Sequence, residues 1–228
     1  MLPALLALAL AAGPEPALVE LYSSEGCSSC PAAEALLRER AARDESLVAL
    51  EFHVDYWNSL GWADPFSSPA FSDRQSRDAA FAGTEQVYTP QAVVDGRARF
   101  VGSDRAALDG AIAAAHDDGK RPLAVSAEEG KLVVVGANVP GGELWVAVTE
   151  SGLQTAVPRG ENQGRVLRHA PVVRSFRELG SVPTGGWTRD VALALDSAWV
   201  RARLRVVAAV QDPRTGRILA LGSARLPR

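Results

Sequence analysis

The sequence predicts an α/β domain with the element order β-α-β-α-β-β-α and a mixed sheet, followed by an all-β sandwich. Strand and helix patterns alternate from residue 17 to about residue 119, whereas only strand-like segments follow Pro122. Between the two regions, the polar stretch DDGKRP is typical of a linker. We therefore expect two domains, at residues 17–119 and 122–228.

The first residues predict an exported protein. MLPALLALALAA is too short to span a bilayer, and a Gly- and Pro-containing stretch follows it, as in the apolar part of a signal peptide. We assign residues 1–16 to this leader and expect a periplasmic or secreted protein, in a compartment that permits disulfides. No later segment is apolar enough to predict stable membrane insertion.

The first predicted domain begins with a β-α-β unit. Residues 17–22 (ALVELY) predict a strand, and an apolar stripe from Pro31 onward predicts an amphipathic helix. Residues 47–56 (LVALEFHVDY) predict a long second strand. A unit of this size favours a parallel pair with a right-handed crossover.

The rest of that domain is predicted to contain two helices and a hairpin. A helix is expected over residues 69–82, and residues 86–101 predict two strands that turn at Asp95-Gly96. A last helix is expected over residues 105–116. Beyond it, six to eight short strands in about 105 residues, separated by turns, predict the sandwich.

Composition and motifs exclude several functions. The chain is 47% hydrophobic and 22% charged with a formal net charge of −3, and it lacks a clustered basic region, so nucleic acid is not an expected partner. It contains no HExxH, no GxSxG and no glycine-rich phosphate loop. We therefore expect no cofactor and no metal.

The chemistry is predicted to reside in the sequence CSSC, which holds the only two cysteines, Cys27 and Cys30. A loop between a strand and a helix would place Cys27 at a helix N-terminus, where free backbone N–H groups favour the thiolate. Cys30 could then resolve a mixed disulfide formed at Cys27. We predict a thiol–disulfide oxidoreductase that acts on protein or small-molecule disulfides, while its redox partner is not indicated.

Residues 19–112 resemble the thioredoxin-like superfamily in element order, in CxxCP at the first helix and in Thr89-Pro90 before the penultimate strand. The resemblance implies that Pro90 is cis and faces the cysteines, and that the backbone of Thr89 pairs with the substrate chain. Thioredoxins carry a buried acidic residue six positions before the first cysteine. Leu21 occupies that position here, so the usual proton acceptor is missing.

A narrower resemblance covers nearly the whole mature chain. It rests on the strings SSEGCSSCPAAEALL, FHVDYWNSLGWADPFSSPAFSDRQ, VYTPQAVVDG and GENQGRVLRHAPVVRSF. These are similar to an exported bacterial thioredoxin-like family, the domain of unknown function 1223 family. The resemblance implies a fold but supplies no substrate, because the family is functionally uncharacterised.

Four further candidates, His53, Asp55, Tyr56 and Trp57, follow one another at the end of the second strand. Ligands bind outside the carboxyl ends of strands in open α/β sheets. Asp55 is therefore a possible proton acceptor, and the two aromatic residues are a possible substrate platform. The alternative is that His53 is a hydrogen-bonded core residue and the aromatic residues pack the long loop.

Two other functions stay open at this point. The chain could be a non-catalytic envelope binding or assembly module whose CxxC disulfide is inert. It could also be a Cu(I) metallochaperone, because two thiolates and an imidazole, from Cys27, Cys30 and His53, are suitable ligands for a soft ion.

Overall fold

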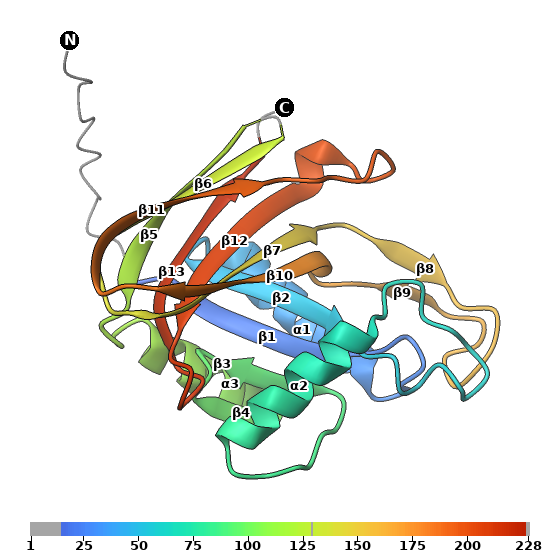
Figure 1. Cartoon of the computed structure of the whole chain (residues 1–228). Helices are drawn as coiled ribbons and strands as arrows, with labels where there is room; N and C mark the ends of the chain where they lie inside the picture. The colour runs from blue at the N-terminus through green and yellow to red at the C-terminus, as the bar shows by residue number, and fades with distance from the viewer. Residues whose placement is uncertain (1–14, 129, 227–228) are drawn as a thin grey trace.

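The structure is a computed structural model that describes residues 15–128 and 130–226 (Figure 1). All but two residues of the predicted leader lie outside this part. In the described residues, no helix has the length and apolar character needed to cross a membrane. The helices are α1 (Cys30–Arg43), α2 (Pro69–Phe81) and α3 (Arg105–Ala115). The strands of the first half are β1 (Ala17–Ser23), β2 (Leu47–His53), β3 (Gln91–Val94) and β4 (Ala98–Val101).

The second half consists of strands and one short 3-10 turn, Arg201–Arg203. A small separate sheet contains only β8 (Gln154–Ala156) and β9 (Val166–Arg168). The other strands are β5 (Arg121–Glu128), β6 (Lys131–Val139), β7 (Gly142–Glu150), β10 (Val172–Val182), β11 (Gly185–Ala192), β12 (Leu204–Gln211) and β13 (Ile218–Arg225).

The predicted fold class, a thioredoxin-like α/β domain followed by a separate β-sandwich, is wrong. One mixed sheet of 11 strands runs through both halves in the order β11-β6-β5-β13-β12-β7-β10-β2-β1-β3-β4 (Figure 1). The two halves join where β10 pairs in parallel with β2, opposite Val172 and Glu51. The backbone N–H of Glu51 also donates to the carbonyl of Pro171 at 2.9 Å.

Individual elements of the first half agree with the sequence patterns. β1 and β2 pair in parallel and in register from Ala17–Leu47 to Ser23–His53. The turn at Asp95-Gly96 joins β3 to β4, and both residues have positive φ, 49° and 66°, as a type I′ hairpin turn requires. β2 ends three residues earlier than predicted, and β3 begins only at Gln91.

The beginnings of the helices have local causes. Pro69 occupies the first turn of α2, and the side chain of Ser68 caps the helix by accepting from Ala70. Asp104 caps α3 in the same way, accepting from Ala107. α1 begins at Cys30, and Pro31 fills its first turn. Cys27 therefore lies in the turn that leads into α1, three residues before the first helical position.

The core surrounds β1 and β2, whose residues are all buried. One face of this strand pair packs against α1 and α3, in an apolar cluster that includes Leu37 and Leu108. The other face packs against α2 and against strands of the second half, around Phe52 and Trp145. This arrangement places the carboxyl ends of β1 and β2 side by side, and the CxxC turn follows the first of them (Figure 1).

Candidate functional site

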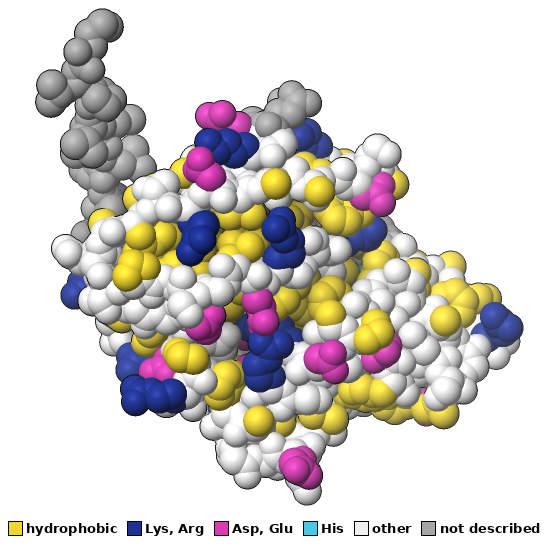
Figure 2. Space-filling view, in the orientation of Figure 1, with side chains coloured by type: hydrophobic (Ala, Val, Ile, Leu, Met, Phe, Trp, Pro, Cys, Tyr) yellow, Lys and Arg dark blue, Asp and Glu magenta, His cyan; other side chains and the backbone are white. Residues whose placement is uncertain are grey.

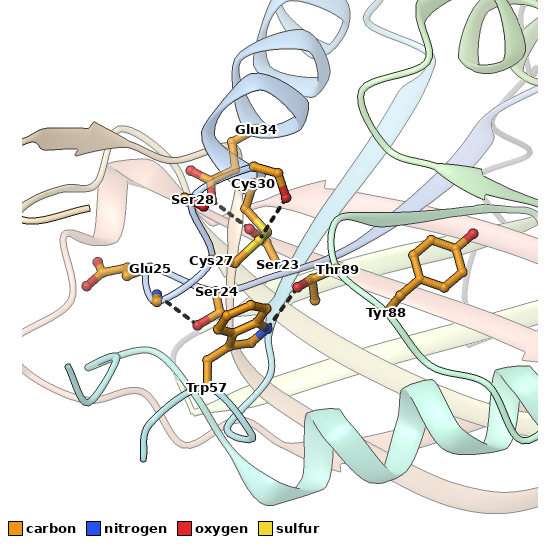
Figure 3. Close-up of a disulfide and its surroundings, with 12 residues drawn as sticks. Ser23, Ser24, Glu25, Cys27, Ser28, Cys30, Glu34, Trp57, Tyr88 and Thr89 are labelled. Atoms are coloured by element: carbon orange, nitrogen blue, oxygen red, sulfur yellow. Dashed lines mark hydrogen bonds between the residues drawn. A yellow bond between two sulfur atoms is a disulfide. The ribbon is translucent and has the colours of Figure 1, made fainter. Parts of the chain in front are cut away.

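The two cysteines form a disulfide at the entry to α1, with their Cα atoms 5.4 Å apart (Figure 3). Cys27 is 1% exposed and Cys30 is fully buried. Ser28 and Ser29 between them are exposed, so the disulfide lies directly beneath the surface of a turn. The hydroxyl of Ser29 is 3.4 Å from the sulfur of Cys27.

Two of the predicted site residues, Trp57 and Thr89, lie beside this turn. The Thr89-Pro90 bond is cis, as the resemblance implies. The indole N–H of Trp57 donates to the hydroxyl of Thr89 at 2.9 Å, and Figure 3 shows both residues next to the disulfide. A Cβ at Gly26 would lie 2.9 Å from that of Trp57, so the CxxC turn and Trp57 are in close contact.

The other two candidates of this group face α2. The hydroxyl of Tyr56 donates to Gln75 at 3.1 Å, and the ring is 40% exposed. Asp55 accepts a hydrogen bond from the hydroxyl of Ser72. The side chain of Asp55 is thus held by α2, and its role as proton acceptor stays a prediction.

A segment from the second half covers the turn. The side-chain amide of Asn162 is buried and donates to the carbonyl oxygens of Glu25, at 2.8 Å, and Cys27, at 2.9 Å. The carboxylate of Glu161 accepts from the backbone N–H of Ser28 at 3.0 Å. We call residues 157–165, which connect β8 to β9, the covering loop.

A buried group of ionisable side chains lies beneath the turn, and we call it the carboxylate–imidazole cluster. None of its members is more than 5% exposed, and on the face shown in Figure 2 no described histidine reaches the surface. Of its members, only His53 was a predicted site residue. The members are Glu25, Glu34, Glu51, His53, Asp64 and His169.

His53 is paired at both ring nitrogens. Nδ1 lies 2.6 Å from a carboxylate oxygen of Asp64, and Nε2 lies 2.8 Å from Glu51. Burial alone would lower the pKa of His53, but these two carboxylates outweigh it and raise the pKa to about 10. The structure thus shows His53 as a hydrogen-bonded core residue. It forms no ligand set with the cysteines, which are bonded to each other.

His169 joins the second half of the chain to the CxxC turn. Its Nε2 lies 3.1 Å from Glu25, and its Nδ1 lies 3.2 Å from Glu34 and 3.5 Å from Glu51. Burial would lower the pKa of His169, but these carboxylates raise it to about 12. Glu34 also accepts from the hydroxyl of Ser23 at 2.6 Å, and burial together with Glu51 raises its pKa.

The missed residues carried only a weak signal in the sequence. They come from the β1–α1 turn, α1, β2, the loop after β2 and the segment before β10, so no fixed spacing connects them. Each does fall within, or directly beside, one of the strings that carry the family resemblance.

Comparison with known proteins gives a family and a fold. A protein of Agrobacterium tumefaciens, AGR_C_4864, has a crystal structure similar to this chain, with a TM-score of 0.73 and 26% identity over 95% of this chain and 96% of that one. HBP35 of Porphyromonas gingivalis matches with a TM-score of 0.65 and 16% identity, over 93% of this chain and 76% of that one, which shows a shared fold alone. No curated protein gives a significant match. Residues 18–211 match the family described as "Protein of unknown function (DUF1223)", and the chain therefore belongs to that family.

Proposed function

We propose that this protein is a thiol–disulfide oxidoreductase whose reacting pair is Cys27 and Cys30. The observation that carries the proposal is a disulfide between two neighbouring cysteines, directly before a helix and beneath two exposed serines. Resemblance of residues 19–112 to the thioredoxin-like superfamily supports it, since the CxxCP sequence and the cis Pro90 match that superfamily.

The reaction needs no cofactor. In the reduced protein, the Cys27 thiolate attacks one sulfur of a substrate disulfide, forming a mixed disulfide and releasing the other sulfur as a thiolate. The Cys30 thiolate then attacks the sulfur of Cys27, which restores the Cys27–Cys30 bond and releases the second substrate thiolate. Two electrons pass to the substrate, and with a dithiol as partner the same steps run in reverse.

Residues around the turn would hold the substrate. The hydroxyl of Thr89 accepts the hydrogen bond from Trp57, which holds this residue in place. The superfamily resemblance assigns the backbone of Thr89 to pairing with the substrate chain. Tyr56 is exposed close by in sequence and offers an aromatic surface. These contacts suit an extended segment of a protein substrate. A small disulfide would need access only to the sulfur of Cys27.

Access is the main physical requirement of this proposal. Because Cys27 is only 1% exposed, a second disulfide can reach its sulfur only after the turn or the covering loop moves. We further propose that the protein works after export, in an oxidising compartment, as the apolar leader in the sequence predicts.

The burial of both cysteines favours a second function, a non-catalytic envelope module with an inert disulfide. The two proposals differ in a simple measurement. An oxidoreductase exchanges with glutathione and has a Cys27 thiol more acidic than an ordinary cysteine, whose pKa is about 8.5. An inert module does neither.

Insulin reduction and refolding of scrambled ribonuclease test the proposed activity. We expect the wild type and a Ser126→Ala control on β5 to be active, and Cys27→Ser to fall to the uncatalysed rate. Cys30→Ser should accumulate mixed disulfides, because the resolving thiol is missing. Equal rates in all four proteins would remove the enzymatic proposal and leave the inert module.

A further inference from the structure

The carboxylate–imidazole cluster has the organisation of a metal site, a feature that the proposed redox chemistry does not use. Four carboxylates and two imidazoles occupy one buried volume. Within it, the donor atoms of Glu51, His53 and His169 all lie within 4.8 Å of one another. Burying four carboxylates together is unfavourable unless positive charge compensates for them.

Each imidazole is oriented by a carboxylate at one nitrogen. Asp64 holds Nδ1 of His53 at 2.6 Å, and Glu25 holds Nε2 of His169 at 3.1 Å. Metal-binding histidines are usually oriented in this way, because the outer carboxylate fixes the tautomer and increases the basicity of the opposite nitrogen. The opposite nitrogens of the two rings both point toward Glu51.

Several inner atoms lack a hydrogen bond, although they are buried. In the described residues, Nδ1 of His169, Oε2 of Glu34 and Oε2 of Glu51 have no hydrogen-bond partner. Nδ1 of His169 and Oε2 of Glu34 are only 3.2 Å apart, yet they do not form a hydrogen bond with each other. Buried polar atoms without partners are rare and require an explanation, and coordination of an ion is one.

Three of the distances between the inner atoms are close to the ligand spacing around a small ion. In a tetrahedral site with bonds of about 2.0–2.1 Å, neighbouring ligand atoms are about 3.3 Å apart. Here the distance from Glu51 Oε1 is 2.8 Å to His53 Nε2 and 3.5 Å to His169 Nδ1, and His169 Nδ1 lies 3.2 Å from Glu34.

We propose that Glu34, Glu51, His53 and His169 bind one divalent first-row transition ion, with Zn²⁺ the best match to two imidazoles, two carboxylates and tetrahedral spacing. Asp64 and Glu25 are the outer residues that orient the histidines.

The site would connect the two halves of the chain. Glu34 belongs to α1 and Glu51 to β2, whereas His169 precedes β10. Through Glu25, which accepts from His169 and donates its backbone N–H to Asp64 at 2.8 Å, the site also holds the loop before Cys27. The cysteines themselves are not ligands, so the metal proposal does not depend on the proposed oxidoreductase activity.

The test is metal stoichiometry on the full chain. We would incubate the protein with ZnCl₂, remove free ion by gel filtration and measure zinc by mass spectrometry, both with the folded protein and after refolding in the presence of Zn²⁺. We expect about one equivalent, as for a single four-ligand site, and a higher Tm than for the chelator-treated protein. The proposal is overturned if the protein retains less than about a tenth of an equivalent of zinc by both routes, loading of the folded protein and refolding with Zn²⁺.

Variants then locate the ion. His169→Gln and Glu34→Gln should lose it, whereas His116→Gln, a change of a histidine outside the cluster, should keep it. The double variant Cys27→Ser/Cys30→Ser should also keep it, and loss of zinc there would contradict the proposed ligands. If His169→Gln does not fold, the absorption spectrum of the wild type loaded with Co²⁺ is the second test. A tetrahedral spectrum without a thiolate-to-cobalt band supports the site, and a thiolate band overturns it.

Discussion

The side-chain amide of Asn162 donates a hydrogen bond of 2.9 Å to the carbonyl oxygen of Cys27, 135 residues away in the sequence. The same amide also donates to Glu25. These bonds hold the covering loop, which belongs to the second half of the chain, on the CxxC turn.

Asn162→Ala should therefore speed up reduction of the disulfide. Each of the two lost hydrogen bonds contributes about 1 kcal/mol, so opening of the covering loop should become roughly thirtyfold more frequent. The measurement is the rate at which dithiothreitol reduces the Cys27–Cys30 bond, with Gln163→Ala, an exposed neighbour, as the control. An unchanged rate in Asn162→Ala would show that the loop does not limit access.

Trp57→Phe should impair protein substrates more than small ones. The change keeps an aromatic ring but removes the N–H that holds Thr89. We expect kcat/KM for insulin to fall about five- to tenfold, the value of roughly one hydrogen bond, while reduction by dithiothreitol stays the same. Trp187→Phe is a matched control, because its indole N–H has no partner among the described residues. If the rates with insulin and with dithiothreitol fall equally, Trp57 contributes to the stability of the fold and not to substrate binding.

Arg74→Met should destabilise the protein strongly. Arg74 is 2% exposed, pairs with the buried Glu20 at 2.6 Å, and lies over the rings of Trp145 and Phe176. Removing it leaves a carboxylate buried without its partner, which costs about 3–5 kcal/mol in the free energy of unfolding. Urea denaturation measures this loss.

The matched control for that experiment is Arg77→Met on the same helix. Arg77 pairs with Glu178 at the surface, where both side chains are about half exposed. Such pairs contribute about 0–1 kcal/mol. Similar losses for the two variants would mean that burial of the Arg74 pair has no special role.

Gly102→Ala should disturb the position of Pro90. A Cβ at this position would lie 2.6 Å from Leu21 and 3.2 Å from Ala33, and the backbone N–H of Gly102 donates to Pro90 at 2.9 Å. We expect a loss of about 1–3 kcal/mol in the free energy of unfolding and a lower insulin reductase rate.

Gly110→Ala is the control for this glycine. Gly110 lies inside α3, and a Cβ there would meet no atom within 4 Å. Alanine is favoured over glycine in a helix, so thermal unfolding should show a gain of roughly 0.5–1 kcal/mol. A gain in both variants would contradict the close packing around Gly102.

Local signals in the sequence predicted much of the first half. The turn at Asp95-Gly96, the proline at the start of α2 and the apolar run of β2 are short-range features, and the structure contains each of them. The contact between β2 and β10 could not be predicted in the same way. It joins residues more than 100 positions apart, and only one pair, Val172 and Glu51, forms the ladder.

The candidate site shows the same division between local and distant signals. Cys27, Cys30 and the cis Pro90 follow from short motifs and a family resemblance, and the structure contains the disulfide and the cis bond, with Trp57 in contact with the CxxC turn. Asp55 was selected by its place at the end of a strand, but its side chain turns to α2. The members of the carboxylate–imidazole cluster come from five separate segments, so only the folded chain reveals them.

The single ladder contact between β2 and β10 has a consequence during synthesis. Until residue 172 has left the ribosome, the outer edge of β2 has no partner, and an open strand edge is a template for pairing with another chain. A nascent chain that stops at residue 119 would present this edge permanently. Folding before the second half emerges therefore carries a risk of aggregation.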